Sequence, residues 1–129
     1  MNFDLFVDRF EAGRSIGASA EIFEKVFGPY VVERDKIFRR LSLGEDAGTD
    51  AYLDGSGACM FNHFGGEHFF ALLFQYLSEA RSIAYWPGEG CSAAVVDPTL
   101  LGELPAEMIK ALRPAVVSSS AELAQTVAS

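Results

Sequence analysis

The side chains with the widest chemical range in this chain are Cys59, His63, His68 and Cys91. Zinc binds thiolate sulfur and imidazole nitrogen in a tetrahedral arrangement, so these four residues belong to the two residue types that form a zinc site. Their spacing argues against one, because Cys59 and His63 lie on one expected strand with their Cα atoms ~13 Å apart. The chain also lacks C-x-x-C and H-E-x-x-H motifs. We therefore expect no metal and no cofactor.

Cys91 and His63 are also the candidates for nucleophilic catalysis. Cys91 follows an expected strand, in a loop of the kind that often carries functional residues. A catalytic thiolate needs a base and an electropositive setting, yet no Lys or Arg lies within eight residues of Cys91. His63 supplies the base only if the fold brings the two segments together. We assign no catalytic residue, and the balance favours a protein that is not an enzyme.

Two further motifs resemble known sites without their full pattern. Residues 13–17, GRSIG, match the G-x-S-x-G nucleophile elbow, but only one expected strand precedes Ser15, so we expect an ordinary loop. The acidic segment from Asp46 to Asp54 lacks the ligand spacing of a calcium loop. No glycine-rich nucleotide motif is present.

The segment around Tyr85-Trp86 is the main candidate for a binding surface. Trp and Tyr are enriched among residues that dominate protein interfaces, and Glu89 in the following loop adds a negative charge. Together with Asn62, these are the residues we expect to contact a partner. The alternative for Tyr85 and Trp86 is a place at the rim of the hydrophobic core.

Composition limits the classes of partner. The chain has 129 residues, which fits a single domain spanning 1–129, and half of them are hydrophobic. It has 10 basic and 18 acidic residues, a net charge of −8, which disfavours nucleic acids and anionic membranes. This acidity can serve solubility alone, and the alternative is that it steers a basic partner. The sequence shows no signal peptide and no apolar stretch near the ~20 residues of a membrane span. We expect a cytoplasmic location with reduced cysteines, while pairing of Cys59 with Cys91 stays open if the chain is exported.

Hydrophobic periodicity and turn residues predict the elements that position these side chains. Helices are expected at 19–27, 67–80 and 119–128, with a helical turn at Asp97-Pro98 and another helix opened by Pro105. Strands are expected at 3–7, 31–43, 51–53, 58–64, 82–86, 93–96 and 116–117, with a hairpin turn at 54–57. The expected fold class is α+β, or mixed α/β. It consists of a single mixed, largely antiparallel sheet packed by about four helices.

Six short motifs in chain order support a family resemblance. They are FDLFV at 3–7, FGPY at 27–30, DG at 54–55, FNH at 61–63, WPG at 86–88 and LP at 104–105. In this pattern the chain resembles a family of small uncharacterised bacterial proteins. The resemblance implies a bacterial, stand-alone domain, and it transfers no activity and no catalytic residues. In size and acidity the chain is also similar to toxin-neutralising immunity proteins.

Three functional hypotheses follow. The first is a non-enzymatic acidic domain that binds a basic protein, in the manner of an immunity protein. The second is a small enzyme or ligand-binding protein with a pocket around His63, Asn62 and Cys91. The third is a homodimer in which Trp86 is buried across a two-fold axis.

Overall fold

The computed structural model describes residues 1–44, 48–53 and 59–129. Its strands are β1 (Leu5–Asp8), β2 (Phe10–Glu11), β3 (Arg14–Ser15), β4 (Val31–Arg34), β5 (Phe38–Leu41), β6 (Thr49–Leu53), β7 (Cys59–Asn62), β8 (Ile83–Tyr85), β9 (Ala93–Val95) and β10 (Ala115–Val116). Its α-helices are α1 (Ala20–Phe27), α2 (Glu67–Ala80), α3 (Ala106–Leu112) and α4 (Ser120–Ala128), and two short 3₁₀ helices are η1 (Gly28–Tyr30) and η2 (Pro98–Glu103).

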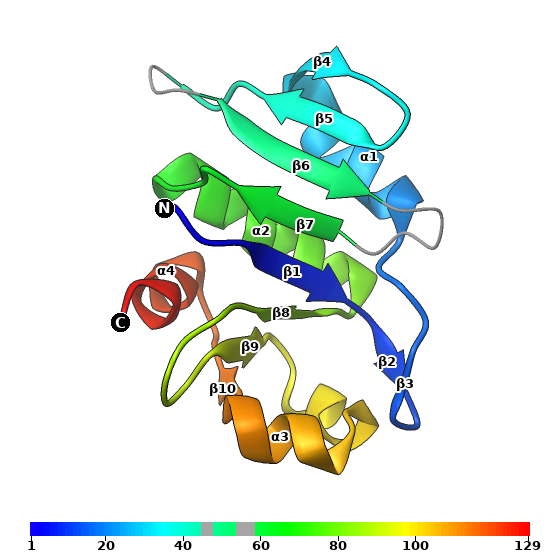
Figure 1. Ribbon diagram of the computed structural model, residues 1–129, viewed down its shortest axis with the longest axis vertical. Coiled ribbons are helices and arrows are strands. Elements are labelled where there is room, and N and C mark those ends of the chain that lie inside the picture. Colours follow the sequence, from blue (N-terminus) through cyan, green and yellow to red (C-terminus); the bar gives the residue numbers. More distant parts are fainter. Residues whose placement is uncertain (45–47, 54–58) are drawn as a thin grey trace.

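Eight of these strands form one sheet in the order β10-β9-β8-β1-β7-β6-β5-β4, and β2 and β3 form a separate hairpin (Figure 1). The β9–β10 pair is parallel, and the other pairs in the large sheet are antiparallel. The expected α+β class with a mixed, largely antiparallel sheet is therefore confirmed. None of the described helices is long and apolar enough to cross a membrane.

Side-chain caps fix the helix starts where the sequence predicts them. The Ser19 hydroxyl accepts a hydrogen bond from the Ile22 amide at the start of α1. The Asp97 carboxylate does the same for Thr99 at the start of η2. At α4 the Ser119 hydroxyl accepts from the amide of Glu122, whose carboxylate accepts from the Ser118 amide, one residue before the cap. The bonds from the amides of Ile22, Thr99 and Glu122 each satisfy a donor that the helix itself leaves free.

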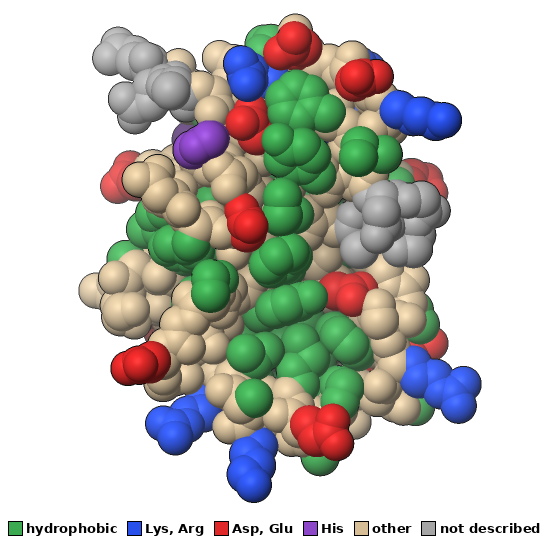
Figure 2. Space-filling view, viewed as in Figure 1, with side chains coloured by type: hydrophobic (Ala, Val, Ile, Leu, Met, Phe, Trp, Pro, Cys, Tyr) green, Lys and Arg blue, Asp and Glu red, His purple; other side chains and the backbone are tan. Residues whose placement is uncertain are grey.

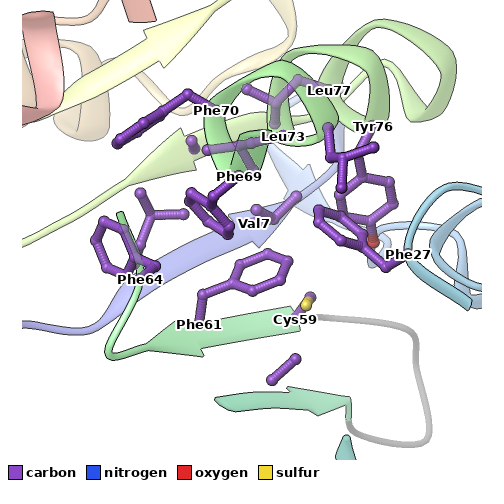
Figure 3. Close-up of a cluster of buried hydrophobic side chains, with 14 of the residues drawn as sticks. Val7, Phe27, Cys59, Phe61, Phe64, Phe69, Phe70, Leu73, Tyr76 and Leu77 are labelled. Carbon is purple, nitrogen blue, oxygen red and sulfur yellow. The ribbon is translucent and has the colours of Figure 1, made fainter. Parts of the chain in front are cut away.

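One face of the sheet carries the main hydrophobic core, under α1, α2 and α4 (Figures 1 and 3). Alternate residues of each strand point to this face, so Phe61 of β7 is fully buried between its half-buried neighbours Met60 and Asn62. The Phe61 ring lies 5.1 Å from that of Phe27 and 5.3 Å from that of Phe69. Burial of these large rings is what holds the helices onto the sheet.

The opposite face is covered only at one end. There η2 and α3 pack on β8 and β9 around Ile83, Val95, Leu100 and Leu104, which form a second buried cluster. The β2–β3 hairpin contacts the end of η2, where the Gly13 amide donates to the Glu103 carbonyl. On this face, the part of the sheet formed by β1, β7, β6 and β5 carries no helix among the described elements (Figure 1).

One sequence prediction needs correction, and another falls outside the described residues. The single strand expected at 31–43 is two strands, because the chain turns after Asp35, whose amide donates to the Phe38 carbonyl. Ile37 lies beside that turn and is 54% exposed, so it does not share the buried face of Leu41. The hairpin turn expected at 54–57 lies outside the described residues, but β6 and β7 on either side of it pair as predicted.

The loop expected around residues 13–17 is in part a tight hairpin. Ala12 and Gly13 both have positive φ, 50° and 79°, and they connect β2 to β3. Two such residues form the type I′ turn that suits a two-residue hairpin. This hairpin could not be predicted from the sequence, because Ala12 occupies a position of positive φ where Asn, Asp or Gly is usual.

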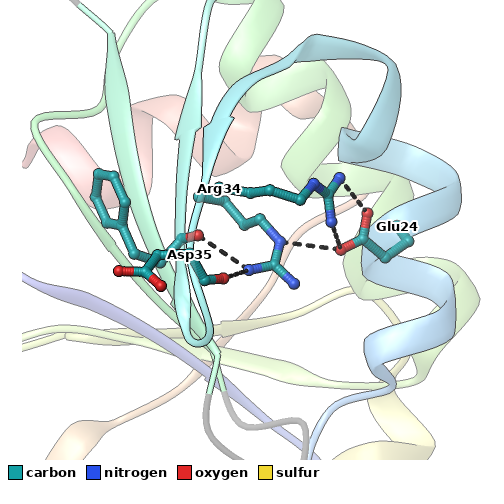
Figure 4. Close-up of polar contacts among 5 residues, drawn as sticks. Glu24, Arg34 and Asp35 are labelled. Atoms are coloured by element: carbon teal, nitrogen blue, oxygen red, sulfur yellow. Dashed lines mark hydrogen bonds and ion pairs between the residues drawn. The ribbon is translucent and has the colours of Figure 1, made fainter.

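A carboxylate and two arginines tie α1 to the β4–β5 hairpin (Figure 4). Glu24 accepts two hydrogen bonds from the guanidinium of Arg34 and one from Nε of Arg39. These partners, Arg34 first, outweigh partial burial and lower the pKa of Glu24 below its ordinary value. The cluster is partly open to solvent, which screens it and limits its contribution to stability.

We expect Glu24→Gln to lower the free energy of unfolding at pH 7 by about 0.5–1.5 kcal/mol, because it removes the charge shared by both arginines. A lowered pKa stabilises the fold above the unfolded-state pKa, and this stabilisation disappears as pH falls through the folded-state value. Urea unfolding at pH 7 and near pH 3 measures the effect. The two proteins should converge at low pH, and a difference that persists there would contradict the assignment.

Tyr76 of α2 is fully buried against the sheet, and its hydroxyl donates to the Ser19 carbonyl. Burial, followed by the electrostatic influence of Cys59 and Asp8, raises the pKa of Tyr76 well above its ordinary value. The unfolded chain therefore loses this proton near pH 10 while the folded protein keeps it.

We expect the stability of the protein to fall as pH rises above about 10, with Tyr76 contributing up to about 1.4 kcal/mol per pH unit. In Tyr76→Phe that contribution is absent, so the slope of stability against pH should be shallower. Denaturant unfolding between pH 8 and 11 measures both slopes, with Tyr52→Phe as the control at a less buried tyrosine. Equal slopes for the original protein and Tyr76→Phe would refute this role.

Candidate functional site

A row of apolar side chains crosses the uncovered face of the sheet. It consists of Phe38 on β5, Tyr52 on β6, Met60 on β7, Phe6 on β1 and Tyr85 on β8, and we call it the open-face row. Strand register places each member directly opposite the next, from Phe38–Tyr52 through Tyr52–Met60 and Met60–Phe6 to Phe6–Tyr85. All five are half-buried, and Figure 2 shows hydrophobic side chains in a continuous band along this face.

Ring contacts order both ends of the open-face row. Phe6 and Tyr85 stack with centroids 5.3 Å apart and planes inclined by 20°. At the other end the rings of Phe38 and Tyr52 are 5.4 Å apart, and the Arg40 guanidinium lies 5.7 Å from the Phe38 centroid. Burial, followed by the nearby Asp8 carboxylate, raises the pKa of Tyr85 above its ordinary value. These contacts give the row a preformed surface of large, ordered side chains.

A polar row runs beside the apolar one, one same-face position away along the strands. Asn62 at the end of β7 donates a hydrogen bond of 2.5 Å to the carboxylate of Asp4, the residue before β1. Asp50 on β6 is mostly buried and lies 3.0 Å from Arg40 Nε and 3.4 Å from His63 Nδ1. This margin therefore combines two carboxylates: Asp4, which has no ion-pair partner among the residues that the structure describes, and Asp50, which Arg40 and His63 already share.

Asp8 forms the opposite margin of the open-face row. It lies two residues after Phe6, is 8% exposed, and accepts hydrogen bonds from the Arg9 amide and the Ser15 hydroxyl. Ser15 belongs to the β2–β3 hairpin rather than to a strand-to-helix elbow, so the G-x-S-x-G match has no catalytic geometry. Among the described residues, neither Asp8 nor Asp4 has an ion-pair partner.

His63 and Cys91 lie in different hollows of the surface. His63 lines a broad hollow with His68, Arg40 and Asp50, at the start of α2. Its backbone has a positive φ of 55°, and its side chain is 60% exposed. Cys91 lines a smaller hollow with Trp86 and Glu89, and its thiol contacts the Ala93 carbonyl at 3.5 Å. The structure thus does not bring together the pair that the enzyme hypothesis needs.

The expected binding residues divide between two locations. Tyr85 belongs to the open-face row, and Asn62 belongs to the polar row next to it. Trp86 is only 4% exposed and packs in the main core, which is the alternative position considered from the sequence. Since its own chain covers Trp86, its burial needs no second copy. Glu89 is exposed in the loop after β8, at the smaller hollow.

The residues that sequence reasoning missed are Phe38, Tyr52, Met60 and Phe6. Their signal in the sequence was an apolar residue at a strand position where alternation predicts a polar one, most clearly Phe6 between Leu5 and Val7. Such a residue indicates a strand with both faces apolar, but not which strands lie beside it. Over the described part of the chain, no group of three or more His, Cys, Asp or Glu side chains could hold a metal ion.

Comparisons with known proteins identify no family for this chain. No family model, no curated protein and no solved structure gives a significant match. The bacterial family suggested by the short motifs therefore stays a prediction, and the function has to be argued from the site alone.

Proposed function

We propose that this domain binds a basic protein partner through the open face of its sheet and catalyses no reaction. The observation that carries the proposal is the open-face row, five large apolar side chains in strand register on a face that η2 and α3 cover only at its β8–β9 end, as far as the described residues go. Aromatic residues and Met are enriched in the cores of protein interfaces, and a polar surround is their usual setting.

The charge of the domain supports a basic partner. The net charge is −8, and Asp4 and Asp8 lie on either side of Phe6 with no ion-pair partner in the described part of the chain. A partner with lysines or arginines at those places would gain electrostatic attraction and faster association. A second copy of this chain fits less well, because pairing two such faces would bring their acidic margins together. Neutralisation of a basic toxin would be one use of this binding.

The enzyme alternative has less support. It requires His63, Asn62 and Cys91 to surround one cavity, and the two hollows separate His63 from Cys91. The contact between His63 and Asp50 orients one imidazole, but no nucleophile accompanies it among the described hydrogen-bond partners.

Site-specific photo-crosslinking tests the proposed function. A photoreactive amino acid replaces Met60 on the open face or, as the matched control, exposed Ala71 on α2 on the opposite side of the sheet. In extract of the source cells we expect the residue-60 probe to capture one basic protein, and the residue-71 probe to miss it. Capture should weaken in Asp4→Asn/Asp8→Asn. The proposal would be overturned if only the residue-71 probe captured a protein, or if neither probe did. It would also be overturned if Asp4→Asn/Asp8→Asn captured the protein as well as the original sequence does.

A further inference from the structure

The dimensions of the open-face row restrict the kind of partner surface that can occupy it. The row is one side chain wide and crosses five strands. With strands ~4.8 Å apart, its length is roughly 19 Å. Along β1 the apolar surface stops after one residue, because Asp4 and Asp8 lie ~7 Å to either side of Phe6.

A long, narrow apolar strip suits a helix better than a second sheet. A helix is about 10–12 Å across with its side chains, and its apolar stripe is also one or two side chains wide. Two sheets that stack face to face need apolar side chains over several rows, and here the second row contains Asp4, Asn62 and Asp50.

The ends of the strip set the length of that helix. Beyond Tyr85 the face is closed by η2 and α3, and Tyr85 itself packs against the cluster beneath them. Beyond Phe38 only β4 remains, with Glu33 opposite Arg40. At 1.5 Å per residue, about 13 residues of helix span the roughly 19 Å between these limits.

We infer that the partner presents a basic amphipathic helix that lies along the open-face row, across the strands. Its apolar residues, spaced i, i+4, i+7 and i+11, pack on Phe6, Met60 and Tyr52. Lysines or arginines on its two flanks lie over Asp4 on one margin and Asp8 on the other. This inference rests on the proposed function and specifies the partner for the same surface.

Three synthetic peptides of about 14 residues test the inference. The first has leucines at the four stripe positions and lysines on both flanks. The second replaces the lysines with glutamates, and the third keeps the lysines but has two central residues replaced by proline, which breaks the helix. Binding to the ¹⁵N-labelled domain is followed by NMR titration, with Met60→Lys and the control Ala71→Lys.

We expect the basic helical peptide to bind with shifts concentrated at Phe6, Tyr52, Met60 and Tyr85. The acidic and the proline peptides should each bind at least tenfold more weakly, as should the basic peptide to Met60→Lys, while Ala71→Lys should change affinity less than threefold. Equal binding of the proline peptide, equal binding of the acidic peptide, or no binding of the basic one would overturn the inference. If the residue-60 crosslink still captures a basic protein in that case, the proposed function stands and only the helical partner is wrong.

Discussion

Phe61→Ala should lower the free energy of unfolding by about 3–5 kcal/mol, a large share of the 5–15 kcal/mol typical of a domain. The Phe61 ring is fully buried and meets the rings of Phe23, Phe27 and Phe69, which belong to two different helices. Its removal leaves a cavity between the sheet and the helix layer that its neighbours only partly fill.

The adjacent residue on β7 provides the control. Met60 points to the open face, so Met60→Ala should cost about 1 kcal/mol or less, although it deletes a side chain of similar size. Denaturant unfolding of both variants measures the difference. Similar losses at the two positions would mean that both faces of β7 are packed, and the open face would not exist.

Met60→Lys should weaken binding of the protein partner by about 2–4 kcal/mol, roughly 30- to 1000-fold in affinity. Met60 is the middle member of the open-face row, where a lysine would lose its hydration beneath the partner and repel the partner's basic groups. The same charge added on the helix side, Ala71→Lys, should leave affinity within about threefold, since rim and remote charges act weakly.

Titration calorimetry with the captured partner measures both variants. Circular dichroism verifies that Met60→Lys is folded, which the acidic surroundings of residue 60 should favour. Unchanged affinity in folded Met60→Lys would remove the open-face row from the binding site. An equal loss in Ala71→Lys would indicate that total charge, rather than this face, controls binding.

The local parts of the fold could be predicted from the sequence because their causes are local. Each of these features depends on residues within a turn or two of each other, and the structure contains all of them: the helix at 67–80, the helix caps Ser19 and Ser119, and the helical turn that begins at Asp97-Pro98. The turn after Asp35, which divides the strand expected at 31–43, was not predicted. The apolar Ile37 fitted the pattern of a continuing strand, although it is exposed beside the turn.

The site could not be predicted because strand order creates it. β1 lies between β7 and β8, so Phe6 meets Met60 and Tyr85, more than fifty residues further along the chain. Tyr85 and Trp86 illustrate the same limit. As neighbours they suggested one aromatic surface, but alternate side chains point to opposite faces, and Tyr85 joins the open-face row while Trp86 enters the core.

The most direct test of the open face as the binding surface uses the methyl groups of methionine. The chain contains three methionines, Met1, Met60 and Met108. Met60 lies in the open-face row, whereas Met108 packs in the cluster under α3. In protein labelled with ¹³C-methyl methionine, we expect the partner to shift the Met60 signal and to shield it from a soluble paramagnetic agent, while the Met108 signal stays in place. A Met60 methyl whose signal does not shift and that stays equally accessible in the saturated complex would show that the open-face row is not the binding surface.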